Sequence, residues 1–321
     1  MAVIAVDLGG TKIASAILDD FGNIKFTHKN LLSGRGGKDV GKLVMDNISR
    51  QLEKAAYHKM DIESIGISIP GSVDLDTGKI WAPNIPGWES YPLAEEVKSS
   101  LDDRKIPIYI DNDRICSVYG ELWRGAARGC KNVIFMAVGT GIGAGIIIDG
   151  HALHGVRDII GAVGWMALQS PFIPEYIQQG CFEYYASGLG ICSRTKEKVR
   201  ANKAYRGELR QMPISRILPR NVFNAYTHDD PIAHDVLHKA VEMWGMAAAN
   251  LVSIFNPEKI IWGGGIFGPA CNFVEDIYAE AMKWAQPLSI KMVDFVPTDL
   301  HGTAAILGAG YLALNHGNVQ L

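Results

Sequence analysis

Two stretches of the chain repeat one pattern: AVDLGGTKIASAIL at residues 5–18 and AVGTGIGAGII at residues 137–147. Gly10 to Leu18 aligns with Gly139 to Ile147 without a gap, and an Ala-Val pair precedes each stretch. An apolar run that breaks at glycines and then resumes predicts a β-hairpin. We interpret the repeat as one structural unit used twice. The alternative is that two glycine-rich hairpins resemble each other by chance.

Outside the repeat, strand patterns alternate with helical patterns, which predicts an α/β sheet protein. The expected strands and helices cover residues 3–8, 13–18, 38–58, 64–69, 106–110, 113–121, 231–255, 259–262, 271–284 and 303–314. Duplication implies two related α/β domains that face each other across a cleft, where ligands commonly bind. We expect an N-terminal domain at residues 1–113, completed by a C-terminal helix at 303–321, and a larger C-terminal domain at 114–302.

The composition excludes several classes of protein. The 321 residues carry a formal net charge of -3, which gives no basic field for nucleic acid. The longest uncharged stretch, residues 132–148, is shorter than the ~20 residues of a membrane span and contains four glycines. Met1 leads directly into an apolar run without a basic leader, so we expect a cytoplasmic protein. The five cysteines include no C-x-x-C pair, and we interpret them as reduced.

The first glycine turn has the chemistry of an anion site. Asp7 precedes Gly9 and Gly10, and Thr11 and Lys12 follow them. Backbone N–H groups of such a turn converge on an anion, and glycine lets a phosphate approach closely. Asp7 could hold Mg²⁺ directly or through water, because this ion prefers a few carboxylates and keeps its solvent. A plain hairpin turn is the alternative.

Two further glycine runs follow apolar strands. Gly139, Thr140 and Gly141 form one, and the other contains Gly264 and Gly265. Three such glycine runs, each at the end of a predicted buried strand, are not typical of flexible linkers, because linkers are not embedded in buried strands. Neither a G-x-x-x-x-G-K-[ST] loop nor a G-x-G-x-x-G run at the start of the first helix is present, which disfavours P-loop and Rossmann proteins.

A carboxylate pair marks the point where one predicted strand ends and a helix begins. Asp111, Asn112 and Asp113 occupy this point. The positive end of the helix dipole keeps a carboxylate ionised, which suits a base that accepts a hydroxyl proton during phosphoryl transfer. The alternative is simple helix capping. The loops at 70–74 and 83–88 could bind sugar hydroxyls or form ordinary turns.

These motifs, in this order, resemble the ROK family of sugar kinases and sugar-responsive repressors. The series also includes Gly120-Glu121, the segment 180–183 and the segment 186–188, and it covers nearly the whole chain. The resemblance implies an α/β fold of two duplicated actin-like (RNase H-like) domains with a cleft between them. It also implies Mg-ATP-dependent phosphorylation of a hexose-type hydroxyl, usually O6, with Asp113 as the base.

The resemblance assigns further site residues. It places Asn84, Asn112 and Glu183 on sugar hydroxyls, the glycine turns at 7–12 and 139–141 on phosphates, and Gly264 and Gly265 near adenosine. We add the loop residues Gly71 and Ser72 to the candidate substrate-binding set. Family members are often dimers, so a homodimer is a further expectation, and the expected small-molecule partner is a carbohydrate.

The chain departs from the family pattern in two places. Where family kinases carry a Gly-Glu-x-Gly-His segment that grips the sugar, Gly161–Gly164 is followed by a segment in which Trp165 and Leu168 replace the Glu and His. The family's zinc-binding cysteine cluster retains only Gly180 and Cys181. Because His154 and Cys181 do not provide the four ligands of a closed zinc site, we predict no structural zinc.

The lost Glu and His predict an atypical substrate. Charged hydrogen bonds contribute about 1.5–3 kcal/mol each, so an ordinary hexose would bind much more weakly without them. Trp165 could instead stack on a sugar face, an aglycone or a second ring. The alternative is a catalytically weak or inactive sensor of sugar or nucleotide. A repressor is not expected, because the first glycine turn begins six residues after Met1 and leaves no room for a helix-turn-helix domain.

Overall fold

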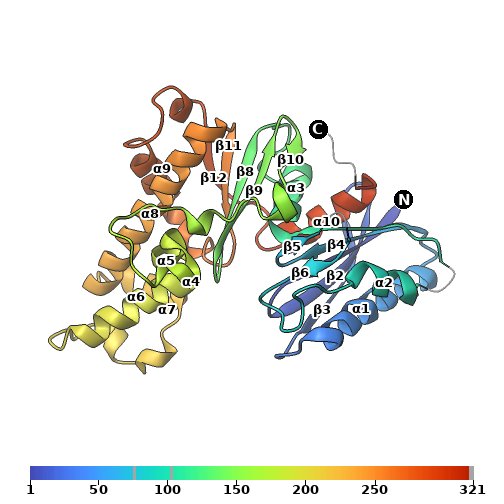
Figure 1. The fold of residues 1–321 in the computed structure, drawn as a ribbon, viewed down its shortest axis with the longest axis horizontal. Coiled ribbons are helices and arrows are strands. Elements are labelled where there is room, and N and C mark those ends of the chain that lie inside the picture. The colour runs from blue at the N-terminus through green and yellow to red at the C-terminus, as the bar shows by residue number, and fades with distance from the viewer. Residues whose placement is uncertain (75–76, 102–103, 318–321) are drawn as a thin grey trace. The chain divides into compact units, whose positions relative to one another are not determined.

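The protein is described by a computed structural model that covers residues 1–74, 77–101 and 104–317 (Figure 1). The chain divides into two compact units. The first unit comprises Met1–Lys131, Gly145–Ile160 and Asp299–Leu321, and the second comprises Asn132–Ala144 and Gly161–Thr298. Residues 318–321 of the expected C-terminal helix lie outside the described residues.

The first unit is built on a five-stranded sheet with the order β3-β2-β1-β4-β7. Its strands are β1 (Ala2–Leu8), β2 (Lys12–Asp19), β3 (Ile24–Leu31), β4 (Ile62–Ile69) and β7 (Ile108–Asn112). The strands β1, β2 and β3 form an antiparallel meander, whereas β4 runs parallel to β1 and to β7. The hairpin predicted at the first glycine turn is therefore confirmed. A small hairpin, β5 (Ser72–Val73) with β6 (Ile80–Trp81), follows β4.

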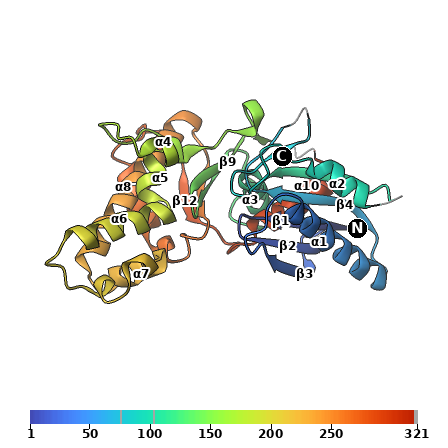
Figure 2. The same cartoon turned by 60° about the horizontal axis from the view of Figure 1, so that its bottom comes forward.

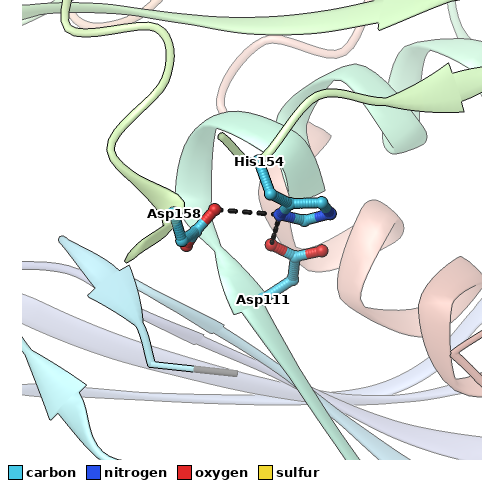
Figure 3. Close-up of side chains that lie close together, drawn as sticks. All are labelled: Asp111, His154 and Asp158. Carbon is cyan, nitrogen blue, oxygen red and sulfur yellow. Dashed lines mark hydrogen bonds and ion pairs between the residues drawn. The ribbon is translucent and has the colours of Figure 1, made fainter. Parts of the chain in front are cut away.

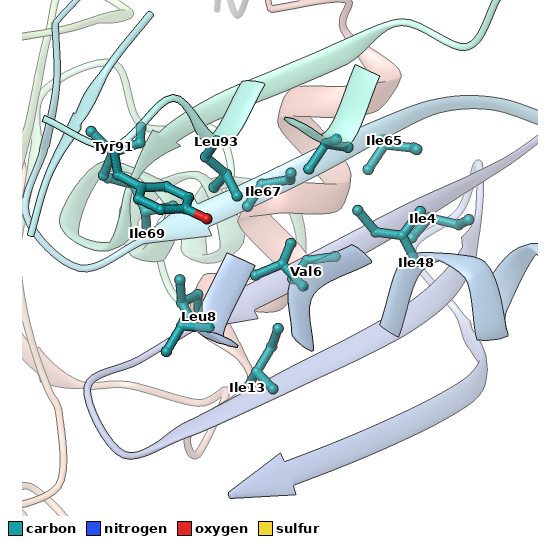
Figure 4. Close-up of a cluster of buried hydrophobic side chains, with 14 of the residues drawn as sticks. Ile4, Val6, Leu8, Ile13, Ile48, Ile65, Ile67, Ile69, Tyr91 and Leu93 are labelled. Carbon is teal, nitrogen blue, oxygen red and sulfur yellow. The ribbon is translucent and has the colours of Figure 1, made fainter. Parts of the chain in front are cut away.

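Helices cover both faces of this sheet (Figures 1 and 2). They are α1 (Gly37–Tyr57) and α2 (Leu93–Ser100) on one face, and α3 (Asp113–Arg124) and α10 (Ala304–Leu314) on the other. Successive side chains of a strand point to opposite faces. Ile4, Val6 and Leu8 of β1 pack into the core that includes α1 (Figure 4), and Val3 and Ala5 pack against α10. The continuous apolar run of β1 thus reflects burial on both faces.

The helices α3 and α10 approach so closely that glycine is required between them. A Cβ atom built on Gly308 would lie 1.6 Å from the carbonyl oxygen of Cys116, and one on Gly120 would lie 2.1 Å from that of Ala304. This packing places all of α3 in the first unit. The sequence-based division placed α3, from residue 114 on, in the C-terminal domain, so the compact units and the expected domains differ here.

A second five-stranded sheet, with the order β10-β9-β8-β11-β12, repeats the topology of the first. Its strands are β8 (Val133–Val138), β9 (Ile142–Ile148), β10 (His151–Ala152), β11 (Lys259–Gly263) and β12 (Asp294–Pro297). β11 runs parallel to β8 and to β12, as β4 runs parallel to β1 and to β7. The repeated glycine turns join β1 to β2 and β8 to β9. The two sheets thus confirm the duplicated α/β fold.

The second unit contains β8, β11, β12 and the first residues of β9, and its remainder is mainly helical. Its α-helices are α4 (Tyr176–Gln179), α5 (Cys181–Ala186), α6 (Gly188–Ala201), α7 (Pro219–Tyr226), α8 (Pro231–Phe255) and α9 (Val274–Ala281). Short 3₁₀ turns in the chain are η1 (Val156–Asp158), η2 (Val163–Trp165), η3 (Glu208–Arg210), η4 (Ile214–Arg216), η5 (Pro269–Phe273) and η6 (Ser289–Lys291). Within the described ranges, none of the helices combines the length and the apolar character needed to cross a bilayer.

Candidate active site

Polar residues gather where the parallel strands of the first sheet end. Asp7 near the end of β1 pairs in register with Ser68 of β4, and Ser68 pairs with Asp111 of β7. Asp113 is the first residue of α3, directly after β7. The carboxyl ends of the central parallel strands thus bring the predicted base and the predicted magnesium ligand to the same edge of the sheet, which in open α/β sheets is where ligands bind.

Burial shifts the protonation of both carboxyl groups. It raises the pKa of Asp113 to about 6, against the opposing effect of Arg114 and with a further contribution from the negative charge of Asp7. Burial also raises the pKa of Asp7, while the cation of Lys12 opposes the shift. Two half-buried carboxylates that repel each other gain from a divalent cation between or beside them. This donor chemistry fits Mg²⁺, which prefers carboxylate oxygens and water.

The first glycine turn lies beside Asn84. The N–H group of Gly9 donates to the carbonyl oxygen of Lys12 over 2.9 Å, which closes the turn. A Cβ atom on Gly10 would lie 3.4 Å from the Cβ atom of Asn84. Thr11, Lys12 and Asn84 are all exposed. The structure therefore brings a predicted phosphate turn and a predicted sugar ligand next to each other within the first unit.

The loop that carries Gly71 and Ser72 is fixed by its backbone. Gly71 has a φ of +121°, and a Cβ atom there would lie 2.0 Å from the carbonyl oxygen of Trp81, so only glycine fits. Ser72 is buried and pairs with Trp81 across the β5–β6 hairpin. Arg114 donates from Nη2 to the carbonyl oxygen of Gly71 over 3.2 Å. The residue that follows Asp113 thus also holds this loop.

Asn112 is buried, and its side-chain amide makes three hydrogen bonds within the protein. Its Oδ1 accepts a hydrogen bond from the N–H of Ile115 (2.9 Å), which caps α3. Its Nδ2 donates to Oδ1 of Asp158 (2.7 Å) and to Oδ1 of Asp111 (3.3 Å). The capping role, considered from the sequence as the alternative, is therefore present. Binding of a sugar hydroxyl by Asn112 stays a prediction.

Asp158 is the centre of a buried polar network that the sequence did not indicate (Figure 3). Its carboxylate accepts hydrogen bonds from Nδ2 of Asn112, from the N–H of Val73 (3.1 Å) and, with His154 as donor, from Nδ1 (2.9 Å). Its carbonyl oxygen accepts from Nη2 of Arg114 over 3.3 Å. The segment that follows β10 is thereby bonded to the β5–β6 hairpin and to the start of α3.

His154 attracts both carboxylates of this network, whereas the carboxylates of Asp111 and Asp158 repel each other. The hydrogen bond to Asp158 raises the pKa of His154, which favours the imidazolium form. Burial raises the pKa of Asp111 to about 7, although His154, with Nδ1 at 3.8 Å from its Oδ1, opposes that shift. A cationic ring between two buried carboxylates offsets part of their desolvation. No local sequence pattern predicts the bonds from Asn112 and Val73 to Asp158, because Asp158 lies 46 residues from Asn112 and 85 from Val73 in the sequence.

Within residues 1–74, 77–101 and 104–317, Asp111, His154 and Asp158 form the one group of three metal-ligand side chains whose ligating atoms all lie within 4.8 Å of one another. Oδ1 of Asp158 and Oδ1 of Asp111 already accept amide hydrogens, and Nδ1 of His154 is bonded to Asp158. The group is thus satisfied as an ion-pair network.

In the second unit, the two other glycine runs lie together. Gly139 and Gly141 close the β8–β9 turn through a 2.9 Å bond, and the N–H of Gly188 at the start of α6 donates to the carbonyl oxygen of Gly139. Gly264 has a φ of +93° and lies against the backbone of Val138, where a Cβ atom would clash. Neighbouring parallel strands and a helix start thus place the predicted residues Gly139, Thr140, Gly141, Gly264 and Gly265 in one region of this unit.

Glu183 lies next to the same β8–β9 turn. Its Oε2 accepts a hydrogen bond from the N–H of Ile142 over 2.7 Å, and burial raises its pKa. Cβ atoms on Gly141 or Gly164 would each lie 2.8 Å from this oxygen. Two glycines therefore make room for the carboxylate. Trp165 follows Gly164, and 54% of it is exposed.

Aromatic side chains fill the segment in which the resemblance implied a cysteine cluster. Tyr176, Cys181 and Tyr184 are buried together, and the Tyr176 and Tyr184 rings meet edge to face at 5.3 Å. The hydroxyl oxygens of Tyr176 and Tyr185 are 2.9 Å apart. Burial of such rings stabilises the α4–α5 segment.

The ROK family profile matches residues 3–316, so the chain belongs to the ROK family. A glucokinase of Halalkalibacterium halodurans is 32% identical over 98% of this chain and 96% of its own length. The crystal structure of a ROK family glucokinase from Streptomyces griseus, in complex with glucose and AMPPNP, is 27% identical and covers 98% of this chain and 100% of its own, with a TM-score of 0.80. A xylose repressor of Caldicellulosiruptor bescii is 28% identical, and the match covers 88% of this chain and 69% of the repressor.

Proposed function

We propose that this protein is an ATP-dependent carbohydrate kinase that phosphorylates a hydroxyl group, O6, of a hexose-type or modified sugar with atypical specificity. Family membership and a glucokinase 32% identical over 98% of the chain make it a sugar kinase. The nucleotide, the acceptor atom and the specificity are the parts that we propose.

The observation that carries the proposal is the position of Asp113. It lies at the start of α3, at the sheet edge where Asp7 also lies, and its pKa is raised to about 6. A carboxylate with this pKa is ionised at neutral pH and is a stronger base than an ordinary aspartate. In our proposal Asp113 accepts the proton of the attacking hydroxyl, while the hydroxyl oxygen forms its bond to the γ-phosphorus of ATP and ADP leaves.

The glycine turns and Asp7 have supporting roles in this proposal. Backbone N–H groups of the turns at 9–12 and 139–141 bind phosphate oxygens, and Gly264 and Gly265 lie near the adenosine. Asp7 would hold Mg²⁺, which supplies positive charge to the phosphates when bound. Lys12 is exposed, and its positive charge acts on Asp7.

Two features support an atypical sugar. The amide of Asn112 is bonded to Asp158, Asp111 and Ile115, so its capacity to bind a sugar is reduced. Trp165 presents a half-exposed indole. A pocket with fewer polar groups and more aromatic surface suits a substituted or larger sugar better than a free hexose.

The test is ADP release with Mg-ATP over a panel of hexoses, amino sugars, glycosides and cyclitols. We expect turnover with at least one of them, and NMR of the product locates the phosphate. The Asp113→Asn variant should lose at least ~100-fold in kcat, because general-base catalysis contributes about 10²–10⁴-fold. Asp46→Asn, at an exposed position on α1, is the matched control and should keep full activity. Full turnover by Asp113→Asn would disprove the role of Asp113.

A sensor without kinase activity is the second candidate, since the relatives include xylose repressors. Calorimetry separates the two. Binding of Mg-ATP or of a sugar, without ADP release from any member of the panel, would favour the sensor.

A further inference from the structure

A pocket of about 250 Å³ lies in the first unit beside the β5–β6 hairpin. Trp81 and Ile159 give it an apolar surface, with 48% and 51% of each residue exposed. Pockets for drug-sized ligands measure ~300–1,000 Å³. The volume here therefore suits a ligand the size of one sugar ring.

The charged residues that line this pocket balance one another. Lys79 and Arg157 are cationic, and Asp74 and Glu89 are anionic. An anionic ligand would meet two carboxylates, and a cationic ligand would meet two cations. A neutral polyol suits such a lining, because its hydroxyl groups both donate and accept hydrogen bonds. The indole of Trp81 adds a flat apolar surface of the kind on which the C–H face of a sugar ring stacks.

The wall of the pocket that carries Arg157 and Ile159 is held in place. Arg157 and Asp158 both adopt left-handed backbone conformations, with φ of +54° and +56°. Such conformations persist in non-glycine residues only where the surroundings enforce them. Here the buried Asp158 carboxylate accepts the N–H of Val73, which directly follows the pocket residue Ser72. The pocket is thus shaped by buried hydrogen bonds before any ligand binds.

Ser72 connects this pocket to the candidate active site. It lines the pocket, and its neighbour Gly71 is bonded to Arg114, the residue after Asp113. We infer that the pocket is an outer subsite that binds the second ring of a disaccharide or glycoside, while the first ring carries the hydroxyl that is phosphorylated. This inference rests on the proposed kinase function and names the substrate class.

The experiment compares glucose with disaccharides that contain glucose as substrates of the full-length protein. Initial rates are measured with Mg-ATP and glucose, maltose, cellobiose or sucrose, for wild type and for Trp81→Ala. We expect at least one disaccharide to have a higher kcat/KM than glucose. Trp81→Ala should lower the disaccharide-to-glucose ratio of kcat/KM about 10-fold, mainly through KM, which corresponds to ~1.4 kcal/mol.

Two further variants separate the role of the indole from damage to the fold. Trp284→Ala removes another exposed tryptophan, in the second unit, and should leave the ratio unchanged. Trp81→Phe keeps an aromatic face and should retain most of the preference. An unchanged ratio in Trp81→Ala, or a wild-type enzyme that prefers glucose to every disaccharide, would overturn the subsite.

Failure of the kinase proposal has a different signature, namely no turnover of any sugar. Calorimetric titration of the same disaccharides into wild type and Trp81→Ala then decides the subsite by itself. About 10-fold weaker binding by the variant supports it, and equal binding or no binding by the wild type overturns it.

Discussion

Removal of the Asp158 carboxylate is the most informative single perturbation of the candidate site. Three donors converge on it: the N–H of Val73 at 3.1 Å, Nδ2 of Asn112 at 2.7 Å and Nδ1 of His154 at 2.9 Å. Asp158→Ala leaves all three without this acceptor, and Asp158→Asn offers one oxygen and turns an NH₂ group towards the remaining donors.

The expected loss of stability in each Asp158 variant follows from these contacts. A hydrogen bond to a charged group contributes about 1.5–3 kcal/mol, but three bonds to one carboxylate do not add independently. Removing one partner of a buried charged pair costs about 3–5 kcal/mol, and this is the destabilisation that we expect for Asp158→Ala. Asp158→Asn should lose about 1–3 kcal/mol. Asp158→Gly should be about 1–2 kcal/mol more stable than Asp158→Ala, because it relieves the left-handed backbone.

Urea unfolding followed by circular dichroism and tryptophan fluorescence measures these differences. The exposed Asp46→Asn serves as the control and should stay within about 0.5 kcal/mol of wild type. If Asp158→Ala also stays within that range, the network does not hold the hairpin and α3 together, and the reasoning fails. If Asp158→Gly is less stable than Asp158→Ala, the left-handed backbone stores no strain.

Two further predictions concern catalysis and packing. In the proposed mechanism Asp113 is the general base. Because its pKa is raised to about 6, it is protonated and inactive below that pH, so kcat/KM should fall about 10-fold per unit below pH 6 and be level above pH 7. A profile that is flat from pH 5 to 8 would contradict this. Gly308→Ala should destabilise the protein by about 3 kcal/mol or more, because the new methyl group would lie 1.6 Å from a backbone oxygen of α3. Gly268→Ala, with open space around it, should be nearly neutral, and urea unfolding of the two variants measures the difference.

The elements that the sequence predicted correctly are those that local patterns define. The helix expected at residues 231–255 has these bounds in the structure, because the Asp230 side chain caps its first turn and Pro231 starts it. The repeated glycine turns predicted the duplicated sheets, since a hairpin is specified by residues adjacent in sequence. Asp113 was placed at a strand end and a helix start for the same reason.

The parts that the sequence did not predict depend on contacts between distant segments. Asp158 carries no motif, yet its carboxylate accepts a hydrogen bond from the amide of Asn112, the residue before Asp113. The assignment of α3 to the first unit depends on Gly120 and Gly308, whose close helix contacts have no local signature. The outer pocket at Trp81 combines segments separated by the whole of α3 and β8–β10.

The position of α10 affects when the first unit can complete its packing during synthesis. Val3 and Ala5 face this helix, and Oγ of Ser64 donates to the carbonyl oxygen of Ala313 over 2.9 Å. The part of this sheet face that α10 covers therefore stays exposed until residues 304–314 have been synthesised. The first unit cannot complete this packing before residues 304–314 are available, although domains usually fold in the order of their synthesis.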